Sequence, residues 1–182
     1  PSLEALQENI AQLQVQAILP DSYVQTRDLL MFVPALRGQP LFENPNAVFK
    51  ISARVSGNMN RIVAEELQLS GYRNTRVDLR GTITGLPDME RLHANVRINM
   101  LRTTGRDIAG FLPPAALKQI QLPEVIVLKG NIDGNPRNMQ AMLNLQTTEG
   151  NMAVNGSISG LGNMEAAAYD MQLMADEVKM GK

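Results

Sequence analysis

The sequence predicts a mainly β protein: a curled antiparallel sheet, forming a β-trough or open solenoid, made of repeated four-strand units that each follow a short helix. Two observations support this fold class. The segment G-T-I-T-G-L-P-D-M-E at 81–90 returns as G-S-I-S-G-L-G-N-M-E at 156–165, 75 residues later. In addition, aliphatic and polar side chains alternate over many short runs, which is the period of a strand with one apolar face.

Length and composition limit the function classes. The chain has 182 residues, enough for one sizeable core or a short array. Its net charge of −1 gives no electrostatic support for binding nucleic acid or an anionic membrane. Cysteine is absent, which excludes a disulfide scaffold and a cysteine-ligated metal. The longest apolar run, at 29–36, is far shorter than the roughly 20 residues of a membrane span.

The first part of the chain, 1–26, is predicted to be the tail of a preceding repeat. Residues 2–7 resemble a degraded copy of the repeated segment, and alternation at 13–19 predicts a strand. A helix over 3–18 is the alternative, because its leucines and isoleucine also have helical spacing. Residues 20–26 are expected to form a loop. Because the chain starts at a proline and both ends fall within a repeat, we expect a fragment of a longer protein.

Two repeat units are predicted to follow, at 27–105 and 106–182, and to form one continuous module with the tail. The octapeptide R-D-L-L-M-F-V-P at 27–34 predicts a short helix with an acidic first turn and a proline end, and R-D-I-A-G-F-L-P repeats it at 106–113. A further helical turn is expected at 115–120. Four segments with alternating apolar residues follow each helix. After the first helix they lie at 51–55, 67–69, 77–83 and the even positions of 92–100. After the second they lie at 126–132, 139–145, 152–158 and 169–173.

The connections between these segments are short, so the strands should be antiparallel neighbours. Gly57 and Gly134, 77 residues apart, are expected in equivalent turns. An open sheet of eight or nine strands exposes one apolar face, and two short helices are too small to cover it, so the sheet is expected to curl. Gly81, Gly130 and Gly156 on that face would either relieve crowding in a packed aliphatic core or shape a trough for flexible hydrocarbon chains.

The aliphatic residues of the alternating segments are the candidate groove lining. Aromatic residues are only 4% of the chain, so the lining is almost without rings. The candidates are Ile51, Val55, Leu67, Leu69, Val77, Leu79, Ile83, Val96, Ile98, Leu128, Ile132, Leu143, Leu145, Met152, Val154, Ile158, Met171 and Leu173.

The repeated helix pattern, the segment Y-R-N-T-R-V-D-L-R-G at 72–81 and the pattern G-x-I-x-G-L-x-[DN]-M-E resemble the repetitive β region of TamB-type translocation and assembly module proteins, in the AsmA-like group. The resemblance covers nearly the whole chain, most specifically 47–175. It implies a periplasmic segment of a long envelope protein that is anchored in the inner membrane of bacteria with two membranes. It also implies an extended sheet with a hydrophobic groove and a role in outer-membrane protein assembly and phospholipid transport.

The expected function is therefore non-catalytic: the groove binds or conducts the acyl chains of phospholipid or another lipid and so supports outer-membrane biogenesis. The resemblance further implies that the parent chain binds an outer-membrane barrel assembly protein, while neighbouring repeats of the same chain contact this segment. The alternative is a scaffold or chaperone-like module for outer-membrane protein assembly through protein–protein contacts. An enzyme is the third hypothesis, and it requires a cofactor site in loops without a recognisable motif.

Residues that could support catalysis have simpler explanations. His93, the only histidine, alternates with apolar neighbours and is expected on the polar face. The carboxylate pairs Asp88 with Glu90 and Glu65 with Glu66 are expected to be solvated in a turn and at a strand edge. The segment 160–162, G-L-G, lacks the third glycine and following helix of a phosphate-binding loop. We predict no catalytic residue, no metal ligand and no cofactor.

Overall fold

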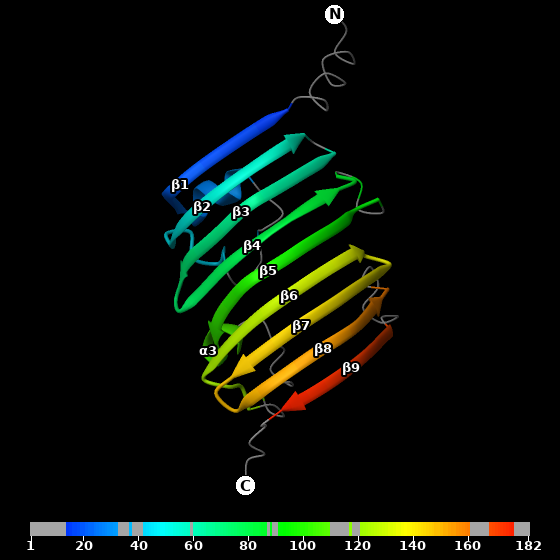
Figure 1. Cartoon of the computed structure of the whole chain (residues 1–182). Coiled ribbons are helices and arrows are strands. Elements are labelled where there is room, and N and C mark those ends of the chain that lie inside the picture. The colour runs from blue at the N-terminus through cyan, green and yellow to red at the C-terminus, as the bar shows by residue number, and fades with distance from the viewer. Residues whose placement is uncertain are drawn as a thin grey trace, which may run out of the picture.

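The computed structural model describes residues 14–32, 37, 42–58, 60–86, 88, 91–109, 117, 121–160 and 168–176. The described part is one sheet of nine strands in chain order, each antiparallel to the next (Figure 1). Two short helices, α2 (Thr26–Phe32) and α3 (Gly105–Ala109), connect β1 to β2 and β5 to β6. The strands are β1 (Val15–Gln25), β2 (Val48–Asn58), β3 (Arg61–Tyr72), β4 (Thr75–Thr84), β5 (His93–Thr104), β6 (Val125–Asn135), β7 (Asn138–Thr147), β8 (Gly150–Ser159) and β9 (Ala168–Asp176).

The prediction of a mainly β, antiparallel fold is confirmed. The sheet twists and is at most slightly curved (Figure 1). The trough, the four-strand unit as a structural repeat and the division at 26 and 105 stay predictions. Both predicted helices begin one residue early, at Thr26 and Gly105. The predicted turn at 115–120 lies outside the described residues, apart from Leu117, and so does the degraded copy at 2–7.

The predicted loop at 20–26 is wrong. The strand β1 continues to Gln25, with an irregularity in its pairing to β2 between Leu19 and Ser22. Pro20 has no backbone N–H to donate, and Asp21 has a φ of 42°, so the ladder breaks locally and then resumes. In the described part, β1 pairs only with β2, and such an edge strand tolerates proline. The alternative prediction is a helix over 3–18. Its last part, from Val15 onward, belongs to the strand β1 instead.

The predicted placement of Met100 on the apolar face is also wrong. The β4–β5 register pairs Leu79 with Ile98 but Asp78 with Met100, so Asn99 is an extra residue in β5. A bulge of this kind moves the following side chains to the opposite face of the strand. Met100 therefore lies on the same face as Asp78, and the next apolar-face residue is Leu101.

Two hairpins, β2–β3 and β6–β7, have the same backbone construction. The side-chain Oδ1 of Asn58 accepts hydrogen bonds from the N–H groups two and three residues later, each 2.9 Å long, and Asn135 does the same at the same lengths. Each asparagine follows a glycine, Gly57 or Gly134, with a φ of 141°. A Cβ at these glycines would lie 1.9 Å and 2.3 Å from a carbonyl oxygen of the facing strand, so only glycine fits.

The packed core is small and lies beside α2. Phe49 is fully buried, Ile51 and Ala53 are nearly so, and Leu29 of α2 packs on this cluster. The ring of Phe42 lies against Phe49, with a centroid distance of 5.7 Å and an interplanar angle of 54°. The aromatic contact and the helix therefore close one corner of the sheet, over β1 to β3.

Candidate functional site

The strand registers place all eighteen candidate lining residues on one face, which we call the apolar face. Residues paired directly across antiparallel strands point to the same side, so rows of side chains can be followed from strand to strand. Three such rows start at Ile51, Ala53 and Val55 on β2. They are Ile51, Leu69, Val77, Leu101, Leu128, Leu145 and Met152; Ala53, Leu67, Leu79, Ile98, Gly130, Leu143, Val154 and Leu173; and Val55, Ala64, Gly81, Val96, Ile132, Ala141, Gly156 and Met171.

A fourth row begins at Gly57 and continues through Ile62, Ile83, Ala94, Gly134, Met139 and Ile158. All four rows cross the sheet roughly perpendicular to the strands. The aliphatic surface is therefore continuous from β2 to β9, with small residues in the third row.

This face is largely open. Of the eighteen candidates, Ile51 alone is buried, fifteen are half-buried, and Met171 and Leu173 are 41% and 62% exposed. Aliphatic side chains that are continuous over eight strands and only half-buried form a candidate interaction surface.

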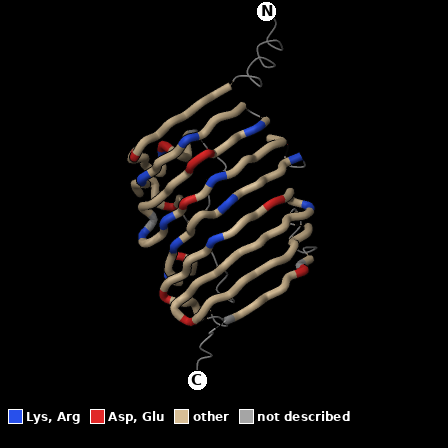
Figure 2. The backbone as a smooth tube through the Cα atoms, viewed as in Figure 1, with Lys and Arg blue, Asp and Glu red and all other residues tan. Residues whose placement is uncertain are grey.

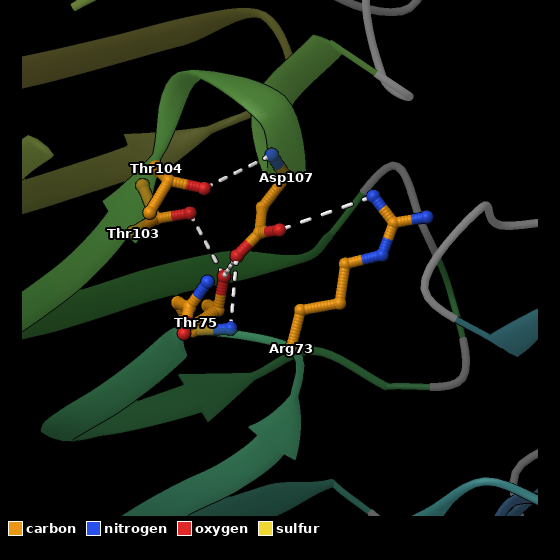
Figure 3. A network of polar contacts seen from close by, with 6 residues as sticks. Arg73, Thr75, Thr103, Thr104 and Asp107 are labelled. Atoms are coloured by element: carbon orange, nitrogen blue, oxygen red, sulfur yellow. Dashed lines mark hydrogen bonds and ion pairs between the residues drawn. The ribbon is translucent and has the colours of Figure 1, made fainter. Parts of the chain in front are cut away.

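The start of α3 is attached to the β3–β4 hairpin through Asp107 (Figure 3). Its side chain is 2% exposed. Its Oδ2 accepts hydrogen bonds from the Asn74 N–H at 3.1 Å and the Thr75 hydroxyl at 3.0 Å. Its Oδ1 lies 3.9 Å from Nη1 of Arg73. A buried carboxylate with this many donors is held in place, so Asp107 joins the start of α3 to the β3–β4 hairpin.

Two threonines at the end of β5 complete this network. The hydroxyl of Thr103, a buried residue, lies 2.8 Å from that of Thr75, and Thr104 Oγ1 accepts the Asp107 N–H at 3.3 Å (Figure 3). Among the described residues, no buried side-chain nitrogen or oxygen is left without a partner. The sequence signal for this junction was the recurring Arg-Asp pair at the helix start, but its partners lie more than 30 residues away.

The opposite side, the polar face, carries the charged strand residues. His93 lies here, as predicted, and is half exposed, with Nε2 3.6 Å from Oδ2 of Asp133. The same carboxylate oxygen accepts a hydrogen bond from the side chain of Asn95.

The predicted carboxylate pairs also have structural partners. Glu65 lies 3.9 Å from Arg54, and Glu66 accepts a hydrogen bond from the Gln68 side chain at 3.1 Å. Asp88 lies 3.5 Å from Arg91, while Glu90 is outside the described residues. In the G-L-G segment, the Gly160 N–H donates to a backbone carbonyl of the β6–β7 turn at 3.2 Å, and the two following residues are not described.

The described residues contain no group of three or more His, Cys, Asp or Glu that could hold a metal ion. Within the same residues, no helix has the length and hydropathy to cross a membrane. Comparisons with protein-family models, with curated proteins and with solved structures find no match.

Sequence reasoning missed one arrangement on the polar face. Arg76 of β4 lies directly opposite Arg102 of β5, and Arg80 lies opposite Arg97. The four arginines are visible in the sequence, but they face one another in this way only because of the extra residue in β5. That residue makes the spacing between Arg97 and Arg102 one longer than the spacing between Arg76 and Arg80.

Proposed function

We propose that the apolar face binds the acyl chains of lipid, and that the chain is a non-catalytic segment of a TamB-type, periplasm-spanning envelope protein that supports outer-membrane biogenesis. The observation that most supports this proposal is the continuity of half-buried aliphatic side chains from β2 to β9. A flexible hydrocarbon lying across the strands would contact the same kinds of side chain at every strand, about 4.8 Å apart.

The physical driving force is burial of apolar surface. Each CH₂ group that leaves water contributes about 0.8 kcal/mol, so a long acyl chain gains several kcal/mol even from partial contact. Methionine and aliphatic walls adapt to hydrocarbon without selecting one shape. Similar rows on successive strands would also let a chain slide without a large change in binding free energy.

We include the trough in this proposal. In the parent chain, further repeats would extend the sheet, and curling would narrow the apolar face into a groove. The two glycines with a φ of 141° support it, because they fall at corresponding places in β2 and β6 and allow strong local bending. The inner-membrane anchor, the periplasmic location and the outer-membrane barrel partner belong to the parent protein by resemblance alone.

The test measures lipid bound to the purified chain after incubation with vesicles of phosphatidylethanolamine and phosphatidylglycerol, by native mass spectrometry and lipid extraction. We expect bound phospholipid, and at least a tenfold loss of it in Leu79→Asp and Val154→Asp. Asn155→Asp is the matched control, because Asn155 is next to Val154 on β8 but is exposed on the polar face. It should bind lipid as the unmodified chain does.

Val154→Thr is a milder variant that keeps the side-chain shape. It provides a test of lipid binding even if the aspartate variants do not fold. It should lose lipid partially while its far-ultraviolet circular dichroism stays the same. Absence of lipid from the unmodified chain, or equal loss in Asn155→Asp, would contradict the proposal.

The scaffold hypothesis is a second candidate because every described side chain of β9 is exposed, on both faces. Such a strand is a ready template for strand addition by another polypeptide. Gln172→Pro in β9 should then abolish binding of an unfolded outer-membrane β-barrel protein while leaving lipid binding unchanged. If that variant keeps both activities, strand addition at β9 is excluded.

A further inference from the structure

Two arginines on the polar face, Arg76 and Arg102, lie opposite each other. Arg76 and Arg102 are Cα partners in the β4–β5 ladder, so their side chains emerge side by side. Like charges in this position repel and destabilise a sheet. Within the described part of the chain, no carboxylate lies at ion-pair distance from either guanidinium.

Two carboxylates in this region have other partners. Asp78, two residues from Arg76, accepts a hydrogen bond from the Asn99 side chain at 2.9 Å. Asp107 is held by the β3–β4 hairpin, including Arg73. Two other cations on this sheet do have nearby anions: Lys50 lies 2.9 Å from Asp21 and Arg54 lies 3.9 Å from Glu65.

Arg76 and Arg102 also line a hollow of about 640 Å³ at the end of β3, β4 and β5. The lining is mainly polar and includes Ser70, Thr104 and Arg73, with Glu124 as the one acidic side chain. Arg73 is paired with Asp107, so the remaining charges of the lining are the two positive charges of Arg76 and Arg102 and the negative charge of Glu124. An anion of matching charge would remove the repulsion and would be contacted from several directions.

We propose that the Arg76–Arg102 pair is a binding site for an oxyanion of the phosphoryl class that carries at least two negative charges. The planar guanidinium fork matches the oxygens of such a group and binds it through two parallel hydrogen bonds. The Ser70 hydroxyl, in the same lining, can add a further donor. The site lies on the face opposite the aliphatic rows, so it does not depend on the proposed lipid function.

The Arg80–Arg97 pair provides an internal control. It has the same cross-strand geometry on the same two strands, and it lines a separate hollow of about 530 Å³. Each hollow has one glutamate in its lining, Glu124 in the first and Glu65 in the second, but the second has no third arginine among its lining residues. Replacing either pair by glutamine removes two positive charges from the same face. A diffuse positive field would be weakened equally by both replacements, whereas a local site is weakened by only one of them.

The experiment is a calorimetric titration of the chain with inorganic pyrophosphate and, separately, with glycerol 3-phosphate. Pyrophosphate represents a free anion, and glycerol 3-phosphate represents a phosphate group on a larger molecule. The probe that binds more tightly indicates which kind of ligand the site takes. We expect one saturable site. Its affinity should fall at least tenfold in Arg76→Gln/Arg102→Gln and stay within about twofold in Arg80→Gln/Arg97→Gln.

A thermal unfolding series adds a second measurement. Pyrophosphate should raise the Tm of the unmodified chain, because a ligand that binds the folded state stabilises it, and should leave the Tm of Arg76→Gln/Arg102→Gln unchanged. Arg102→Lys keeps the charge but loses the fork, and it should bind severalfold more weakly. No saturable binding, equal losses in the two double variants, or normal binding by Arg102→Lys would each overturn the proposal.

Discussion

The strands that follow α2 and those that follow α3 share a backbone pattern but differ in side-chain chemistry. Both groups begin with a hydrogen bond from the first helical residue to the segment before the next strand, Thr26 N–H to Ala47 O at 2.9 Å and Gly105 N–H to Pro123 O at 3.1 Å. Both contain the same asparagine-capped hairpin after a glycine of identical φ. The recurring sequence features thus coincide with recurring backbone hydrogen bonds.

Their charges differ clearly. The polar face of β2 to β6 carries most of the lysines and arginines of the sheet, whereas β7 and β8 have no charged residue (Figure 2). The helix aspartates differ as well: Asp107 is buried among donors, but Asp28 is half exposed beside Arg27 at 3.8 Å. The comparison teaches that backbone construction and apolar rows are repeated along the sheet, while polar chemistry is particular to one region.

The largest expected effects concern one buried apolar residue in each region. Phe49 in β2 is fully buried against Phe42, and Ile126 in β6 is 8% exposed. Phe49→Ala should lower the free energy of unfolding by about 3–5 kcal/mol, and Ile126→Ala by about 2–4 kcal/mol. Urea denaturation followed by circular dichroism measures both. A smaller loss for Phe49→Ala than for Ile126→Ala would show that the core is not centred beside α2.

The two helix aspartates should differ next. Asp107→Ala leaves the Asn74 N–H and the Thr75 hydroxyl without their acceptor, and should cost about 2–4 kcal/mol. Asp107→Asn keeps one side-chain acceptor and should cost less. Asp28→Ala, at an exposed position, should change stability by less than about 0.5 kcal/mol. Equal losses for Asp28→Ala and Asp107→Ala in denaturant titrations would remove this difference between the regions.

The glycines should show similarity instead. Gly57→Ala and Gly134→Ala each place a Cβ against a carbonyl oxygen of the facing strand, at a φ that side chains rarely adopt. Each should lower the free energy of unfolding by about 1–3 kcal/mol, and by similar amounts. Hydrogen exchange of the two hairpins would locate the effect. If only one substitution is costly, the two hairpins are not equivalent in energy.

The smallest effect concerns the irregular part of β1. The Asp21 side chain accepts a hydrogen bond from Lys50 and raises the pKa of Lys50 above its ordinary value of 10.5. A raised folded-state pKa stabilises the protein below the unfolded value, and this contribution is lost as the pH rises through the folded-state pKa. The stability difference between the unmodified chain and Lys50→Met should therefore be constant from pH 7 to 9 and shrink above about 10.5. A difference that grows with pH would contradict the assignment.

Strand positions could be predicted from the sequence because the alternation is a local property. Residues two apart point to the same side, so the runs at 77–83 and 139–145 indicated both the strands and their apolar face. The hairpins were also predictable, since Gly57 and Gly134 are local backbone requirements. Two departures were not predictable. The bulge at Asn99 and the continuation of β1 past Pro20 depend on how the neighbouring strand pairs with each of them. The local sequence pattern of one strand carries no information about that pairing.

The sequence by itself determined the β class, the order of the strands and the one-sided distribution of aliphatic side chains, because these follow from period-two alternation and short connections. Only the tertiary structure decided the register. Register joins distant residues: it brings Asp107 to the β3–β4 hairpin, sets Arg76 against Arg102, and aligns the aliphatic rows into one surface. The physical reason is that pairing depends on the hydrogen bonds of two strands together, whereas alternation belongs to each strand alone.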